Sequence, residues 1–398
     1  MVDFTLDRAT EAMLEMVRWL GREYMRPLGL EADRLHRPIP ADHPFYQKVW
    51  ELGLGRQAWV ETDARDDGSV RTSARRNVVL AEEMSYWDRG VAVSLPGPGL
   101  GGPPVALLGT AEQKERFLGI FQDRSRPHWA AFAMTEPGAG SDVAAIRTRC
   151  RRDGDSWVID GEKMFCSNGA RADWVVVWAT VDPTLGRDGH RAFVVEQGTP
   201  GFRVARIEDK MGLIAYESAA LVFENCRVPA DHLLGGEAAY ASRAGFKGAM
   251  QSFNATRPIV AAMALGIARA AYDRAAEFVR ENYLLSRPLP RYHRLRDKLT
   301  WIRRKLECGR LLCWRAAFLA DHRQPNILEA SAAKAYCPMV AQEATSLALE
   351  VLADAGVRTD HWVEKWFRDV KAMDIVEGTG QIQRRIVARQ LTGAHADA

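Results

Sequence analysis

The spacing of hydrophobic residues changes twice along this chain of 398 residues. Before residue 127 and after residue 238, hydrophobic residues recur with the three-to-four-residue period of an α-helix that buries one face. Between these points lie short runs rich in Val, Ile and Trp, such as WVVVWATV from Trp174, and turn residues separate them. Such runs are typical of β-strands. We therefore predict an α+β multidomain protein, with a helical domain at 1–126, a β domain at 127–238 and a second helical domain at 239–398.

The same patterns divide each domain further. Helices are expected near residues 6–20 and 74–87, and the Gly- and Pro-rich segment from Ser94 to Pro104 is expected to be a loop, either a connector or a pocket wall. Strands are expected to begin near Trp157, Trp174, Ala192 and Ala220. Helical stretches are expected in the last domain over 240–283, 294–321, 328–356, 361–374 and 379–392. Several long helices with short links predict a four-helix-bundle-like domain.

Composition excludes several classes of function. Lys and Arg number 54 and Asp and Glu 51, a net charge of +3 that argues against nucleic acid or an anionic membrane as partner. The six cysteines form no CxxC pair or zinc-like cluster, so we expect no metal and no disulfide framework. The N-terminus lacks the pattern of a secretory signal, and no run of about 18 apolar residues predicts a membrane span. We expect a cytoplasmic protein.

Two segments near the β region suggest a bound ligand. In AMTEPGAGSD, Ala133 to Asp142, hydroxyl groups of Thr135 and Ser141 alternate with glycines that let backbone N–H groups approach a ligand. In GEKMFCSNGARADW, an aromatic ring at Phe165 precedes the hydroxyl of Ser167, a pair that suits a flat cofactor. Taken singly, the first segment also fits an ordinary loop. The second also fits a hairpin whose Phe is part of the core.

A third segment, DIVEGTGQIQRRIVARQLTG, places a carboxylate in front of a helix. Glu377 precedes Gly378, Thr379 and Gly380, and Thr379 is a candidate N-cap for the helix that follows. The N-terminus of that helix would attract phosphate. Glu377 would then project from a loop packed among helices. The alternative is a solvated glutamate that the helix dipole favours.

The order, spacing and amino-acid sequences of the three segments resemble those of the acyl-CoA dehydrogenase family, most closely its medium-chain-like branch. The resemblance runs from about residue 40 to 393 and includes four further matches. These are KMG at Lys210–Gly212, LVFENCRVP at Leu221–Pro229, ATRP at Ala255–Pro258 and VEKWFRD at Val363–Asp369.

The resemblance implies a helical domain, a β-barrel-like domain and a C-terminal helical bundle that together enclose FAD and an acyl-CoA. It implies a role in fatty acid metabolism, in which Glu377 as general base removes the α-proton of the thioester. A hydride then passes to FAD, a 2-enoyl-CoA forms, and an electron-transfer flavoprotein reoxidises the flavin. The implied cofactor-binding residues are Phe132, Met134, Thr135, Ser141, Phe165, Ser167, Thr379 and Gln381. The implied substrate-binding residues are Ser141, Phe253, Asn254, Arg257 and Gly378.

Two segments depart from the family pattern, and both concern contacts with the FAD of a neighbouring subunit. Asn282, Leu285 and Ser286 stand where the family has Arg, Phe and Gly. Glu350 to Asp354 stands where the family has Gln-x-x-Gly-Gly. Three explanations remain open: other groups hold FAD in a homo-oligomer (a dimer or tetramer), a paralogous subunit completes the site in a hetero-oligomer, or FAD binding is lost.

Other functions on this scaffold are an oxidase, a monooxygenase or a non-catalytic subunit. Val376 replaces an aromatic residue that the family often has just before the base. The smaller side chain predicts tolerance of a bulkier or branched acyl group.

Overall fold

The computed structural model describes residues 4–54, 73–240, 244–282 and 290–393, with side chains except those of 244–255 and 290–293. The first described helices are α1 (Arg8–Leu20), α2 (Arg26–Leu35), α3 (Pro44–Glu51), α4 (Ser73–Ser94), α5 (Gly102–Leu108) and α6 (Ala111–Gly119). The last are α7 (Ala244–Asn282), α8 (Pro290–Asp321), α9 (Ile327–Leu352), α10 (Trp362–Asp369) and α11 (Gly380–Thr392). The order of helices, strands and helices that the sequence predicts is confirmed.

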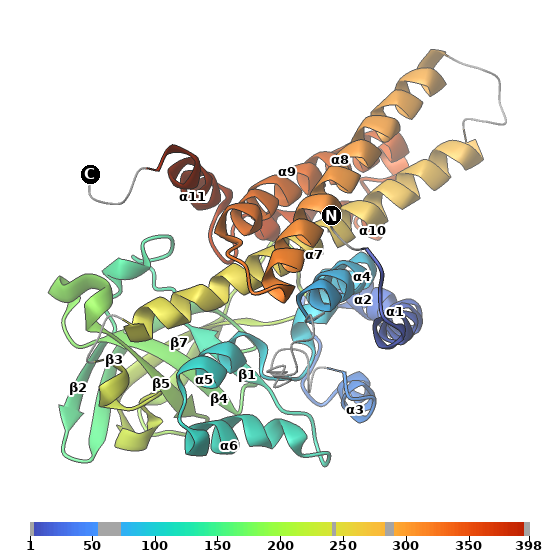
Figure 1. Ribbon diagram of the computed structural model, residues 1–398. Helices are drawn as coiled ribbons and strands as arrows, with labels where there is room; N and C mark the ends of the chain where they lie inside the picture. The colour runs from blue at the N-terminus through green and yellow to red at the C-terminus, as the bar shows by residue number, and fades with distance from the viewer. Residues whose placement is uncertain (1–3, 55–72, 241–243, 283–289, 394–398) are drawn as a thin grey trace.

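The middle of the chain forms a seven-stranded sheet. Its strands are β1 (Ala130–Ala133), β2 (Arg149–Asp153), β3 (Ser156–Ser167), β4 (Trp174–Thr180), β5 (His190–Glu196), β6 (Phe202–Ile207) and β7 (Ser218–Pro229). The strand order is β1-β4-β2-β3-β7-β6, and β5 pairs with β4. Figure 1 shows this sheet and helices α1–α4 below the long C-terminal helices.

The two faces of β4 belong to two different cores. Val175, Val177 and Ala179 face the interior of the sheet domain with residues of β3 and β7. Trp174 and Val176 face the opposite way, against Val105 of α5 and Phe117 of α6. Because both faces are covered, the strand is hydrophobic along its whole length rather than alternating. This explains why the run from Trp174 is so clear in the sequence.

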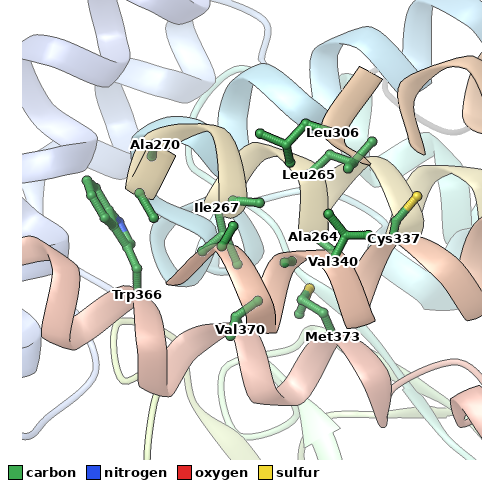
Figure 2. Close-up of a cluster of buried hydrophobic side chains, with 14 of the residues drawn as sticks. Ala264, Leu265, Ile267, Ala270, Leu306, Cys337, Val340, Trp366, Val370 and Met373 are labelled. Atoms are coloured by element: carbon green, nitrogen blue, oxygen red, sulfur yellow. The ribbon is translucent and has the colours of Figure 1, made fainter. Parts of the chain in front are cut away.

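The C-terminal helices share one hydrophobic core. Figure 2 shows small and branched residues of α7, such as Ala264 and Ile267, packed against Val340 of α9. Trp366 of α10 and Met373 close the cluster from the segment that leads into α11. Met373 lies four residues before Glu377, so this core also positions the loop that carries the predicted base.

Three strands and one helix start escaped the sequence analysis. The strands β2 and β6 carry several exposed arginines that interrupt any hydrophobic run. The strand β1 has only four residues, three of which are alanines rather than the branched residues typical of strands. The expectation of a loop up to Pro104 was wrong in its last residues, because α5 begins at Gly102. Pro103 and Pro104 occupy the first turn of α5, where an N–H group needs no partner within the helix.

Candidate active site

Glu377 lies in a tight loop between α10 and α11. Its φ angle is +54° and that of Gly378 is +92°, so two consecutive residues adopt left-handed backbone conformations. A Cβ atom on Gly378 would lie 2.6 Å from Nε2 of Gln383, which explains why this position needs glycine. A non-glycine residue with positive φ is strained and persists only where the surroundings hold it.

Two buried side chains hold this loop. Lys334 of α9 donates from Nζ to the carbonyl oxygens of Met373, at 2.8 Å, and Gly378, at 3.3 Å. Gln383 of α11 donates from Nε2 to the same Gly378 oxygen at 3.2 Å. Both side chains are fully buried. The sequence analysis did not single out Lys334, although a lone lysine among the small and apolar residues of SAAKAYC was a possible signal.

The loop ends at the N-terminus of α11. Thr379 is the N-cap, as the sequence predicts, and its hydroxyl oxygen accepts a hydrogen bond from the Ile382 N–H at 3.4 Å. The cap leaves the remaining N–H groups of the first turn directed away from the helix, toward any anion placed there.

Glu377 is half-buried as a residue, but its Oε2 oxygen is shielded from solvent and cations surround its carboxylate. Burial raises the pKa of Glu377, against the opposing effects of a hydrogen bond with Thr256 and the charges of Arg89, Lys334 and Arg257. Among the residues that the structure describes, its Oε2 atom has no hydrogen-bond partner. A desolvated carboxylate with a free oxygen is a stronger base than a solvated one.

Helix α4 connects the Glu377 loop with the end of β3. Arg89 lies within electrostatic reach of Glu377, and Val93 is one helical turn further along the same face. The carbonyl oxygen of Val93 accepts a hydrogen bond from Nδ2 of Asn168 at 2.8 Å, directly after Ser167. The base and the end of β3 therefore border the same stretch of α4.

The predicted flavin-facing residues come together at a bulge in β3. Between Lys163 and Cys166 the pairing of β3 with β7 shifts, and Phe165 has a φ angle of +56° and an exposed fraction of 57%. The Met164 N–H donates to the Thr135 carbonyl oxygen at 2.9 Å. Thr135, Phe165 and Ser167 are therefore neighbours, and the bulge turns a large ring outward.

A buried ion pair fixes the loop on which Thr135 lies. Lys163 donates from Nζ to Oε1 of Glu136 at 2.7 Å and to the carbonyl oxygen of Met134 at 3.1 Å. The Glu136 carboxylate also accepts from the N–H groups of Arg147, at 2.6 Å, and Thr148, at 3.0 Å. Breaking such a pair from one side is costly, because a buried charge remains uncompensated.

Three domains of one known protein family match this chain. The acyl-CoA dehydrogenase N-terminal, middle and C-terminal domains match residues 7–122, 131–226 and 243–392. The chain belongs to the acyl-CoA dehydrogenase family. It is therefore an oxidoreductase that acts on acyl-CoA, in a family of FAD-dependent flavoproteins.

Individual relatives cover nearly the whole chain. The short-chain specific acyl-CoA dehydrogenase of Bos taurus mitochondria is 38% identical over 95% of this chain and 89% of its own. The acryloyl-CoA reductase (NADH) of Anaerotignum propionicum is 33% identical over 98% of this chain and 96% of its own. The structure of butyryl-CoA dehydrogenase from Megasphaera elsdenii has a TM-score of 0.87 and 31% identity, covering 98% of this chain and all of that one.

The residues on the sheet side of the site suit the family's FAD. Phe165 offers an exposed ring beside Thr135 and Ser167, and a Cβ atom at Gly138 or Gly140 would meet nothing within 4 Å. The loop therefore borders open space that a cofactor can enter. Phe132 and Met134 lie in or next to β1, half-buried and buried.

The remaining predicted site residues lie in different parts of the structure. Arg257 of α7 lies within electrostatic reach of Glu377, and Gly378 forms the loop itself. Ser141 and Gln381 are exposed. The side chains of Phe253 and Asn254 lie outside the described part of the chain.

The segments that depart from the family pattern are only partly described. Asn282 ends α7 and donates to the carbonyl oxygen of Phe278 at 2.9 Å, whereas Leu285 and Ser286 lie outside the described residues. Glu350 forms an ion pair with Lys298. Ala353 has a φ angle of +52°, a conformation that favours the glycine it replaces.

No helix in the described ranges is both long and apolar enough to cross a membrane.

Proposed function

We propose that Glu377 is the general base that removes the α-proton of an acyl-CoA thioester, in an α,β-dehydrogenation that yields a 2-enoyl-CoA. The observation that carries this proposal is the burial of the Glu377 carboxylate, whose Oε2 has no partner among the described residues. A carboxylate held in this way has both the basicity and the free lone pair that proton removal requires.

The cations around Glu377 suit the charge movement of this step. The proton moves to Glu377, and the electron pair of the C–H bond moves onto the thioester, where its oxygen becomes more negative. The net charge of the cluster does not change, so Arg257 and Arg89 face one negative charge before and after the transfer. Fixed charges that need no reorganisation during the reaction stabilise its transition state.

We propose that Thr135, Phe165, Ser167 and the N-terminus of α11 at Thr379 hold FAD, together with Phe132, Met134, Ser141 and Gln381. Bound FAD supplies the acceptor for the hydride from the β-carbon. On the substrate side we propose Arg257 and Gly378 near the thioester, and Ser141, Phe253 and Asn254 toward the CoA moiety. An electron-transfer flavoprotein is the proposed redox partner, and a homo-oligomer or a pair with a paralogue is the proposed assembly.

Glu377→Gln tests the base. Glutamine keeps the size and one oxygen but cannot accept the proton, so turnover of a reactive acyl-CoA with an artificial electron acceptor should be abolished. The visible spectrum of the bound flavin should stay nearly the same. Full activity in the variant would refute the role of Glu377. Oxygen consumption without an added acceptor would identify an oxidase instead.

A further inference from the structure

A cavity of about 560 Å³ lies where the helices α2 and α4 of the N-terminal domain meet α7 and α10 of the C-terminal domain. Figure 2 shows Ala270 and Trp366, two residues of its wall, at one end of the C-terminal hydrophobic cluster. Among the described residues, none of those proposed to bind FAD or the acyl-CoA lines this cavity. Its volume is in the range of sites that bind small molecules.

The carboxylates in the wall of this cavity already have partners. The charged groups of the wall are three arginines and three acids, Arg26, Arg274, Arg280, Asp273, Glu277 and Asp360. Glu277 accepts from Arg274 at 2.7 Å, and both oxygens of Asp360 accept from Arg358, at 3.0 and 2.9 Å. Asp273 accepts a hydrogen bond from the hydroxyl group of Tyr86. These pairs leave Arg26 and Arg280 as the cations that an anion in the cavity could bind.

Arg26 is held in a fixed orientation without a paired carboxylate. It donates from Nη2 to the carbonyl oxygen of Tyr86 at 2.7 Å, and its guanidinium carbon lies 4.8 Å and 5.2 Å from the ring centroids of Trp87 and Trp366. Burial lowers the pKa of Arg26, and the nearby carboxylates attract it only from beyond ion-pair distance. A guanidinium that is partly desolvated and uncompensated gains free energy when an anion pairs with it.

The beginning of α10 adds further donors to the same wall. His361 is the N-cap of α10, and its Nδ1 accepts from the Val363 N–H at 3.2 Å, so the proton of the neutral ring is on Nε2. Burial lowers the pKa of His361, which keeps the ring neutral. Arg280 lies at the exposed end of the cavity, and no carboxylate in the described ranges pairs with it. The N-terminus of a helix also attracts anions.

We propose that this cavity is a binding site for a small oligophosphate, which Arg26, Arg280, His361 and the N-terminus of α10 hold together. The wall follows α7 from Ala270 to Arg280, about 15 Å at the helical rise per residue. A single carboxylate cannot reach donors spread over this length, whereas a chain of phosphates carries acceptor oxygens along it. A bound ligand connects the N-terminal helices with α7 and α10, so it should stabilise the folded protein.

The test is calorimetric titration of the FAD-loaded enzyme with tripolyphosphate at low salt. The wild-type enzyme should bind it, and Arg280→Gln should weaken binding about 10-fold or more, because it removes a charge-assisted contact. Glu277→Gln should change the affinity in the opposite direction, since it removes the acid that pairs with Arg274 and leaves that guanidinium available. Arg315→Gln is the matched control, because Arg315 is an exposed arginine of α8 that pairs with Glu329. Flavin content of each variant reports the fold.

ATP and adenosine distinguish the sources of the phosphate. Tighter binding of ATP than of tripolyphosphate would support a nucleotide as the ligand, and equal binding would support recognition of the phosphate chain alone. Adenosine that binds as tightly as ATP would overturn the proposal, because the phosphates would then contribute nothing. No binding of tripolyphosphate to the wild type would overturn it, and so would equal affinity of the wild type and Arg280→Gln, since the oligophosphate would then occupy another site.

Discussion

Replacing Lys334 by Met should impair catalysis far more than it impairs stability. Burial lowers the pKa of Lys334 from 10.5 to about 8, so the folded protein disfavours the charged side chain by about 3 kcal/mol. Met has a similar shape and no charge, and it removes that unfavourable contribution. Against this, the variant loses charge-assisted hydrogen bonds to two carbonyl groups, each contributing roughly 1.5–3 kcal/mol. The two hydrogen bonds together contribute roughly 3–6 kcal/mol, so we expect a net loss of stability of about 3 kcal/mol or less.

The effect of Lys334→Met on Glu377 has no opposing contribution that would offset it. The Gly378 carbonyl keeps its bond from Gln383, but the Met373 carbonyl loses the Lys334 donor, which loosens the strained loop at Glu377. The charge of Lys334 also opposes the effect of burial on the pKa of Glu377. Without this charge the pKa of Glu377 rises further. Because the base acts deprotonated, the acidic limb of kcat/KM should move to higher pH, with the largest loss of activity on the acidic side of the profile.

Two measurements check this reasoning. The pH profile of kcat/KM with an artificial acceptor reports the base, and flavin content reports the fold. Lys305→Met is the control, since Lys305 is a half-buried lysine of the same domain that pairs with Glu343. The folded protein releases the Lys334 proton near pH 8 and the unfolded chain near 10.5, so wild-type stability should rise in this window relative to the variant. An unshifted acidic limb with wild-type kcat would refute the proposed link between Lys334 and Glu377.

Two further substitutions test the surroundings of the loop. Thr379→Ala removes the N-cap of α11, which should lower stability by about 0.5–2 kcal/mol and weaken retention of FAD. Thr379→Ser keeps the hydroxyl group and should keep both the stability and the FAD. Flavin release during dialysis measures the difference, and equal retention in the two variants would contradict the prediction. Lys365→Met removes the cation buried between Asp88 and Asp369 and should destabilise the protein by about 3–5 kcal/mol. A thermal melt within a degree of the wild type would show that the triad contributes little.

Local patterns predicted those parts of the fold that repeat along the chain. The helices around the C-terminal core bury one face over many turns, so their sequences carry the helical period. Strand β4 buries both faces, so its sequence is one continuous hydrophobic run. The N-cap at Thr379 was predictable because capping depends only on neighbouring residues. Strands β2 and β6 were not predictable, because their exposed arginines mask the alternation of hydrophobic and polar residues.

The surroundings of Glu377 could not be read from local patterns. Arg89, Thr256 and Lys334 come from three helices that lie far from Glu377 in the sequence. No spacing rule connects positions so distant, and only the packing of α4, α7 and α9 brings them together. Lys334 was overlooked for this reason, since its role depends on carbonyl groups of the loop around residue 377.

The departures from the family pattern at the end of α9 include Ala353, which has a backbone conformation that favours glycine. Ala353 keeps a φ angle of +52° with a ψ of −128°, although a residue with a Cβ atom adopts this conformation at a cost of about 1–3 kcal/mol. The surrounding structure must therefore impose the turn. Glu350 does not present a free charge there, because Lys298 neutralises it. A carboxylate that is already paired repels a neighbouring pyrophosphate less than a free one. This pairing therefore weakens one of the two charges that the altered segment introduces, and the second, Asp354, is exposed to solvent.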